Sequence, residues 1–409
     1  MTKPIAISIS PNTQSDDALL ALKLLFQSWR WNQGQNVQKL EKEFELMFPG
    51  YNSLAINSGR NALYLILKSL GIKAGDEVII QAFTCVVVPN SILWTGATPV
   101  YVDIDDSLNI DVNDLKKKIT SKTKAVIVQH TFGVPANLKE IQKLTKAKGI
   151  VLIEDCAHSL GAKYDGKLVG SFGDAAFFSF GRDKIISSVF GGMIISSNSK
   201  LIKQIQSEYQ RLPTPNSFWI FQQLLHPIIF ESFLKPFYNY KLTRGLLSFF
   251  QKLKLLSMAV KDEEKKSIQP SEFPAKMANA LAILALNQLK KLDRFNSHRS
   301  EIVAIYDQSL KYRKTKAFES AGEPSWLRYP VYVENPKRML SRMRRHSIFL
   351  GDWYQSVIMP CDDLDKVKYK LGSCPKAEEI SNHIVNLPTF PGLSQEEAKK
   401  VARLFLENE

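Results

Sequence analysis

Short apolar segments alternate with helix-like segments along residues 51–200, and this alternation limits the folds open to the chain. NALYLILKSLGI, for example, has the spacing of a helix and precedes the strand-like DEVIIQAF. Further strand-like segments are TPVYVDI, TKAVIVQHTFG, IVLIEDCAHS, DAAFFSF and GGMIISS. Nearly continuous apolar strands separated by helices predict an α/β fold with a mostly parallel central sheet flanked by helices. Such sheets bind ligands at the carboxyl ends of their strands.

The length of 409 residues predicts more than one domain. We expect a large domain over residues 1–275 and a smaller C-terminal α+β domain over residues 276–409. Residues 205–270 interrupt the alternation with an insertion rich in aromatic residues and leucine, which has no acidic residue between 232 and 261. The pattern of residues 277–310 then predicts one long helix.

The net charge of +14 favours an anionic partner, such as a phosphorylated small molecule, a membrane surface or nucleic acid. No helix-turn-helix, zinc-finger or RNA-binding signature accompanies this charge, so we expect no binding of nucleic acid. Cys85, Cys156, Cys361 and Cys374 lack the spacing of metal ligands, and we expect neither a metal site nor disulfides. The N-terminal residues do not resemble a secretion signal, which favours a cytoplasmic protein.

Three segments at predicted strand ends or turns carry candidate catalytic groups. Ser58 and Gly59 precede a helix whose first backbone N–H groups can hold a phosphate. Asp155 ends an apolar strand, where a buried carboxylate needs a partner such as a protonated ring nitrogen. Ser179 and Lys184 flank a turn, and a lysine can form a Schiff base with an aldehyde. Each segment alone is also typical of a structural role, but together they supply what pyridoxal phosphate requires.

The order of these motifs resembles the DegT/DnrJ/EryC1/StrS family of pyridoxal-phosphate sugar aminotransferases, which have fold type I. The likeness covers nearly the whole chain. It is carried by SGRNALYLILKSLGIKAGDEVIIQAFTC, HTFGVPANL, IEDCAHSLGAKYDGKLVGSFGDAAFFSF and CPKAEEISNHIVNLPTFPGLSQEE. The resemblance implies that Lys184 holds the cofactor as a Schiff base and then moves a proton between substrate and cofactor. It also implies that Asp155 pairs with the pyridine nitrogen and that His158 lies beside the ring.

The expected phosphate site departs from the family pattern. The resemblance implies that Ser179 and the backbone around Ser58 and Gly59 bind the phosphate. Arg60 stands where many relatives have a threonine, and would replace its hydroxyl with charge. Cys85 stands where an aromatic residue usually stacks on the ring, so stacking has to come from elsewhere or be weaker.

The resemblance also implies the reaction. An amino acid, most often glutamate, gives its amino group to a keto-sugar that is linked to a nucleotide, and the enzyme is a homodimer. Pro274-Ala275-Lys276 replaces a family segment whose asparagine reaches the partner's cofactor, so this contact is not carried over. His346, Trp353 and Tyr354 lie where relatives have sugar-facing residues, while the keto-sugar and the aminated carbon stay open.

Two alternatives remain at this point. Leucine and phenylalanine recur at helical spacing over residues 246–256, with Lys252 and Lys254 off that stripe. Such a helix is typical of membrane surfaces, so residues 212–260 could dock the enzyme at the inner face of the cytoplasmic membrane, near a lipid-linked keto-sugar. The insertion could equally pack on its own domain or on the partner subunit. The altered Arg60, Cys85 and Pro274 also fit a non-catalytic, regulatory or structural member, whereas the retained Lys184 favours catalysis.

Overall fold

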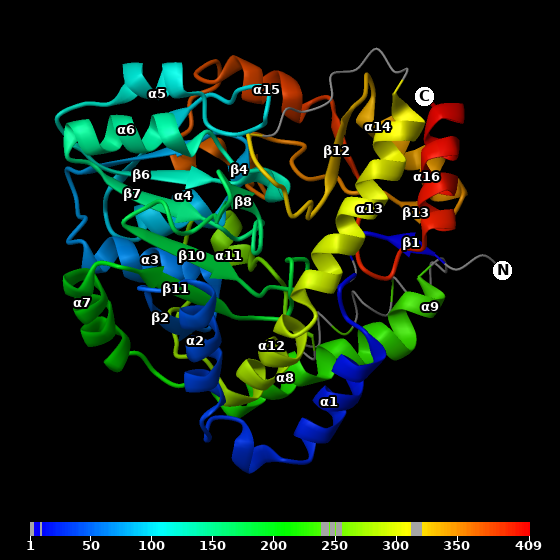
Figure 1. Cartoon of the computed structure of the whole chain (residues 1–409), viewed down its shortest axis with the longest axis horizontal. Helices are drawn as coiled ribbons and strands as arrows, with labels where there is room; N and C mark the ends of the chain where they lie inside the picture. The colour runs from blue at the N-terminus through cyan, green and yellow to red at the C-terminus, as the bar shows by residue number, and fades with distance from the viewer. Residues whose placement is uncertain (1–3, 9, 239–244, 246–249, 251–255, 312–320) are drawn as a thin grey trace.

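A seven-stranded sheet forms the centre of the molecule in the computed structural model, which describes residues 4–8, 10–238, 245, 250, 256–311 and 321–409 (Figure 1). The strand order is β2-β11-β10-β7-β6-β3-β5, and β11 runs antiparallel to both of its neighbours while the other pairs are parallel. The predicted mostly parallel sheet is therefore confirmed. The strands are β2 (Asn52–Ile56), β3 (Glu77–Gln81), β5 (Thr98–Val102), β6 (Thr123–Gln129), β7 (Val151–Asp155), β10 (Ala175–Ser179) and β11 (Gly192–Ser196).

Helices cover both faces of this sheet because successive strand residues point to opposite sides. On one face, Val126 and Leu152 belong to a cluster built with residues of α2, α6 and α12. On the other face, Ile127 and Ile153 belong to a cluster built with residues of α3, α4 and α7. The helices are α2 (Asn36–Met47), α3 (Gly59–Ser69), α4 (Val87–Leu93), α5 (Val112–Lys118), α6 (Leu138–Lys148), α7 (Ser199–Gln210) and α12 (Asn279–Leu289).

A third hydrophobic cluster joins most of the C-terminal elements, which lie together on one side of the molecule (Figure 1). The elements are α13 (Leu292–Leu310), β12 (Tyr329–Tyr332), α14 (Pro336–Arg345), β13 (Ile348–Phe349), β15 (Ile384–Leu387) and α16 (Gln395–Glu407). The start of the chain joins them, because β1 (Ile5–Ala6) pairs in parallel with β13. By contrast, β14 (Ile358–Met359) and α15 (Pro375–Ser381) pack in the cluster of α3 and α4. The predicted domain boundary near residue 275 stays a prediction.

The prediction of one continuous helix over residues 277–310 is wrong. The chain forms α12, which ends at Leu289, and α13, which begins at Leu292. Leu289 at the end of α12 and Leu292 at the start of α13 pack in the same cluster as Leu281, whereas Tyr306, farther along α13, is buried among the C-terminal elements. Neither glycine nor proline marks the break, so the separation follows from tertiary packing and has no local signal.

The insertion over residues 205–270 contains a helix, α8 (Ser217–Ile229), that packs on its own chain. Trp219, Ile220 and Leu224 of α8 are buried in the cluster of α2 and α12, and α8 also contacts α1 (Ser15–Leu25). The shorter α9 (Lys235–Phe237) and α11 (Asp262–Lys265) follow. Most of the stripe over residues 246–256 lies outside the described residues. None of the described helices has the length and apolar character needed to cross a membrane.

Candidate active site

The predicted site residues all line one pocket, at the carboxyl ends of β7 and β10 and the start of α3. They are Ser58, Gly59, Arg60, Cys85, Asp155, His158, Ser179 and Lys184. The topology explains this convergence, because parallel strands bring their carboxyl ends to the same edge of a sheet. The pocket is therefore formed as expected, while the role of each residue stays a prediction.

Lys184 lies in the turn that follows β10. Its backbone N–H donates to the carbonyl of Gly181 at 3.2 Å, and its own carbonyl accepts a hydrogen bond from Nδ2 of Asn12. Burial lowers the pKa of the Lys184 ammonium, although the nearby Asp155 and Asp183 act in the opposite direction. A lowered pKa enlarges the fraction of neutral amine, which is the form that attacks an aldehyde.

Asp155 ends β7 and is only 4% exposed. Its Oδ1 accepts from the backbone N–H of Ala157 at 3.0 Å, and among the described residues Oδ2 accepts no hydrogen bond. Burial raises the pKa of this carboxyl, against the nearby Lys184 and His130. A buried carboxyl that is half satisfied suits a protonated ring nitrogen, which would supply both the missing donor and the opposite charge.

A layer of three rings forms one wall of the pocket. The His158 ring stacks on Phe132 at 6.0 Å and on Tyr354 at 6.4 Å, and Phe132 stacks on Tyr354 at 5.7 Å. Burial and the charge of Lys184 hold the pKa of His158 well below its usual range, so the ring is neutral. Nδ1 accepts from the backbone N–H of Phe132 at 3.3 Å, which leaves the proton on Nε2 as a donor. These rings supply flat surface that Cys85 cannot offer.

The start of α3 forms a cradle of the right chemistry for a phosphate. Ser58 caps the helix by accepting from the N–H of Asn61 at 3.3 Å, and the N–H groups of the first turn have no partner within the helix. A Cβ placed on Gly59 would lie 2.8 Å from Cβ of Ser179, so glycine permits the close approach of α3 to β10. The hydroxyl of Ser179 and the positive end of α3 thus meet in one place.

The guanidinium of Arg60 is engaged by the insertion. Its Nη1 pairs with the carboxylate of Glu264, which is fully buried, and its Nη2 donates to the carbonyl of Ala259 at 2.5 Å. Ala259 and Val260 line the pocket, so this ion pair fixes a wall made by the insertion. Glu264 largely neutralises the charge of Arg60. The expectation that Arg60 takes the place of the threonine that many relatives have at the phosphate therefore stays a prediction.

Sequence reasoning missed part of the pocket wall. Phe132, Arg182, Asp183 and Arg328 line the pocket, but none of them was among the predicted site residues, although residues 323–329 were expected near its mouth. Arg182 and Asp183 sit directly before Lys184, and their charged side chains beside an apolar strand were the available signal. Of the expected sugar-facing residues, Trp353 and Tyr354 line the pocket, whereas His346 is exposed at the end of α14.

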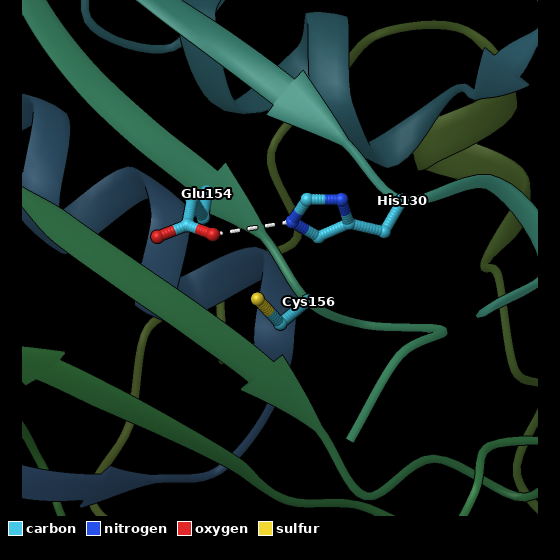
Figure 2. Close-up of side chains that lie close together, drawn as sticks. All are labelled: His130, Glu154 and Cys156. Carbon is cyan, nitrogen blue, oxygen red and sulfur yellow. Dashed lines mark hydrogen bonds and ion pairs between the residues drawn. The ribbon is translucent and has the colours of Figure 1, made fainter. Parts of the chain in front are cut away.

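Behind Asp155, a cluster of His130, Glu154 and Cys156 resembles a set of metal ligands (Figure 2). The atoms of Glu154 and His130 that would bind a metal already have partners: Oε2 of Glu154 faces Nε2 of His130 at 3.2 Å and accepts from a backbone N–H. Oε1 accepts from two further backbone N–H groups, and Nδ1 of His130 accepts from Ala136 at 3.1 Å. The cluster therefore ties the turn of residues 170–173 to β7 and is structural.

The topology of the sheet is that of fold type I. The pocket at its edge brings together a buried lysine, a buried carboxyl and the first N–H groups of α3, a set of groups that suits pyridoxal phosphate. A sequence model of the DegT/DnrJ/EryC1/StrS aminotransferase family matches residues 12–405. The chain belongs to this family, is a transaminase and uses pyridoxal phosphate.

Individual relatives match along almost their whole length. The chain is 29% identical to GDP-perosamine synthase of Escherichia coli O157:H7 over 374 residues, which covers 90% of this chain and 89% of that protein. It is 28% identical to the pleiotropic regulatory protein of Geobacillus stearothermophilus, with coverage of 96% and 94%. Among solved structures, S. venezuelae DesV in complex with a ketimine intermediate superposes with a TM-score of 0.78 at 22% identity, over 100% of this chain and 98% of that one. This structural likeness supports the fold.

Proposed function

We propose that the protein transfers an amino group from an amino acid, L-glutamate by preference, to the keto group of a sugar linked to a nucleotide, in the synthesis of an amino sugar for a surface glycan. The observation that carries this proposal is the convergence of Lys184, Asp155 and the α3 cradle on one pocket of an aminotransferase fold. The names of relatives such as GDP-perosamine synthase support the sugar acceptor. The positive net charge suits a nucleotide diphosphate.

Each of the pocket residues would have a separate role in the reaction. Pyridoxal phosphate supplies an aldehyde that exchanges amino groups and a ring that stabilises negative charge on the reacting carbon. Asp155 would hold the proton on the ring nitrogen, and the N–H groups of α3 with Ser179 would hold the phosphate. The amine of Lys184 would take the proton from the α-carbon of the amino acid and deliver it to the carbon of the cofactor that carried the aldehyde. Nε2–H of His158 would donate a hydrogen bond at the edge of the ring.

The cellular location, the oligomeric state and any contact with a membrane stay predictions. We expect a cytoplasmic homodimer, and we retain membrane docking through residues 212–260 only as an alternative. The retained Lys184, Asp155 and Ser179 favour catalysis over the regulatory or structural role that the altered positions would allow.

The first test is the visible absorption spectrum of the purified protein before and after addition of glutamate. We expect a yellow protein whose long-wavelength band disappears with glutamate. Lys184→Ala should lose that band and lower the rate of amino transfer by about a thousandfold or more, because the covalent link and the proton-transferring amine are both removed. Lys143→Ala, which changes an exposed lysine of α6, is the matched control and should behave as the wild type.

A colourless protein that takes up no pyridoxal phosphate would contradict the proposal. A yellow protein that does not respond to glutamate but responds to another amino acid would retain the transaminase and replace the donor. Candidate nucleotide keto-sugars can then be added to the glutamate-treated protein, and return of the yellow band identifies the acceptor.

A further inference from the structure

The α3 cradle offers a phosphate hydrogen-bond donors but little positive charge. The hydroxyl of Ser179 and the first N–H groups of α3 are neutral, whereas a phosphate monoester carries about two negative charges near pH 7. Arg60 stands in the first turn of α3, but its guanidinium is paired with the buried carboxylate of Glu264. A cation that the protein itself has not neutralised has to come from another part of the pocket wall.

Arg182 lies beside this cradle. The backbone N–H of Gly181, the residue before it, donates to Oγ of Ser179 at 3.4 Å. Arg182 lines the same pocket as Ser58 and Ser179, and it is close enough to Arg60 for the two charges to repel each other. The guanidinium of Arg182 and the neutral donors of the cradle therefore belong to the same part of the pocket.

The guanidinium of Arg182 is enclosed but poorly satisfied. Its Nη2 donates to Oγ of Ser257 at 2.5 Å, and the group lies over the ring of Phe190 at 5.5 Å. Its Nε is fully enclosed and has no hydrogen-bond partner within the part of the chain that the structure describes. Burial lowers the pKa of Arg182 to about 10, although the adjacent Asp183 acts in the opposite direction. An enclosed cation with so few acceptors suits an anionic ligand.

The insertion fixes the direction of this guanidinium. Oγ of Ser257 donates onward to Oε1 of Gln223 at 2.7 Å, and Nε2 of Gln223 donates to the carbonyl of Trp219 at 2.9 Å. Gln223 lies on α8 and is fully buried, so its amide needs both of these partners. This chain of hydrogen bonds holds Nη2 and leaves the other N–H groups of Arg182 for a ligand.

We propose that Arg182 binds the phosphate of pyridoxal phosphate, and that Ser257 and Gln223 are positioning residues that hold its guanidinium in place. A guanidinium can donate two parallel hydrogen bonds to two phosphate oxygens and supplies the charge that the cradle lacks. The diphosphate of a sugar nucleotide has the same chemistry. The position beside Ser179 and α3 favours the cofactor, because these groups already form the neutral part of a phosphate site.

The test measures the affinity for the cofactor with and without its phosphate. The apoenzyme is titrated with pyridoxal phosphate and with pyridoxal, and the absorption of the Schiff base gives both dissociation constants. Arg182→Met should weaken binding of pyridoxal phosphate about tenfold or more and leave that of pyridoxal within about twofold, because only the phosphate loses a contact. Arg182→Lys keeps the charge and should fall between the two. Arg345→Met changes an exposed arginine of α14 and is the control, with wild-type constants.

Gln223→Met tests the positioning role, because it removes the acceptor of Ser257 and leaves Arg182 in the chain. We expect binding of pyridoxal phosphate to weaken about threefold to tenfold, with binding of pyridoxal unchanged. In the double variant Arg182→Met/Gln223→Met, the dissociation constant for pyridoxal phosphate should equal that of Arg182→Met, since Gln223 acts through the guanidinium. Additive losses would mean that Gln223 does not act through Arg182.

Three results would overturn the assignment of Arg182. Equal weakening of pyridoxal and pyridoxal phosphate would make the residue structural. Weaker binding of GDP to the holoenzyme, with the affinity for pyridoxal phosphate unchanged, would assign Arg182 to the diphosphate of the sugar nucleotide. Unchanged binding of all three ligands in Arg182→Met would show that the guanidinium binds no phosphate. The measurement does not depend on the amino donor or the keto-sugar, so it can succeed or fail independently of the reaction proposed above.

Discussion

Glu41 is a half-buried carboxyl outside the pocket whose titration falls in the working range of pH. It lies on α2 and accepts from the backbone N–H of Ala55 in β2 at 2.9 Å. Burial raises its pKa from 4.5 to about 7, and the nearby Glu45 adds to the effect. The folded protein therefore binds this proton more tightly than the unfolded chain. The resulting stabilisation is complete below pH 4.5 and is lost as the pH rises through 7.

Glu41→Gln should flatten the dependence of stability on pH, because glutamine keeps the acceptor for Ala55 and has no charge. We expect the free energy of unfolding of the variant, relative to wild type, to rise by about 1–2 kcal/mol between pH 5 and pH 8. Urea denaturation at both values measures it. Glu43→Gln, on the exposed side of the same helix, should show no such change; an equal change in both variants would assign the effect to net charge.

The sequence allowed the prediction of those pocket residues that lie at the end of a strand or just after it. Asp155, Ser179 and Lys184 follow apolar strands, so the edge of a parallel sheet had to bring them together. The ion pair of Arg60 with Glu264 could not be predicted in this way. Which partner a guanidinium finds depends on which distant segments pack against it, and no spacing along the chain encodes that pairing.

At the scale of elements, the insertion contributes a wall to the pocket through a short segment, residues 257–264. Arg60 of α3 holds Glu264 and the carbonyl of Ala259, and the backbone N–H of Lys261 also donates to Glu264 at 2.9 Å. Asn90 of α4 donates to the carbonyl of Glu264 at 2.7 Å. The segment is thus fastened to the two helices that border the phosphate cradle.

Arg60→Met should release this segment, because Glu264 would be left buried without its cation. Removing one partner of a buried pair costs about 3–5 kcal/mol, and local opening is the cheapest way to rehydrate the carboxylate. Hydrogen exchange followed by mass spectrometry should show faster exchange over residues 257–268 and little change in β6 or β7. The double variant Arg60→Met/Glu264→Met should recover most of the protection; a failure to recover it would mean that the ion pair is not what fastens the segment.

The elements themselves were predicted better than their ends and breaks. The alternation of strands and helices follows from apolar periodicity, which is local. The division between α12 and α13 does not, since Leu289 and Leu292 continue the same pattern and pack in one cluster, while only the later turns of α13 reach the cluster of C-terminal elements. Likewise, the contact of residues 257–264 with α3 joins positions 204 residues apart and has no local signal.

At the scale of the whole molecule, Arg299 connects three regions. It lies fully buried on α13 and donates to Oδ1 of Asn12 at 2.9 Å and to the carbonyl of Ile185 at 3.0 Å. Asn12 in turn donates to the carbonyls of Lys184 and Ile185. Asn12 of the N-terminal segment and Arg299 of α13 therefore together hold the backbone of the turn that carries Lys184.

Arg299→Met should lower the free energy of unfolding by about 2 kcal/mol, because Asn12 and Ile185 lose their donors inside the protein. Urea denaturation of the holoenzyme measures the change. Arg294→Met, which removes an exposed hydrogen bond from the same helix to Gln14, should stay within about 0.5 kcal/mol of wild type. Equal losses from both variants would contradict the proposed network.

The pairing of β1 with β13 has a consequence for synthesis on the ribosome. Ile5 opposes Ile348, so β1 leaves the exit tunnel long before β13 has been made and cannot pair until then. Asn12, a few residues later, is then placed against the lysine turn. All strands of the central sheet are made before β1 can pair and before Arg299, which also holds Asn12, has been added, so the sheet can form before the turn that carries Lys184 is fully braced.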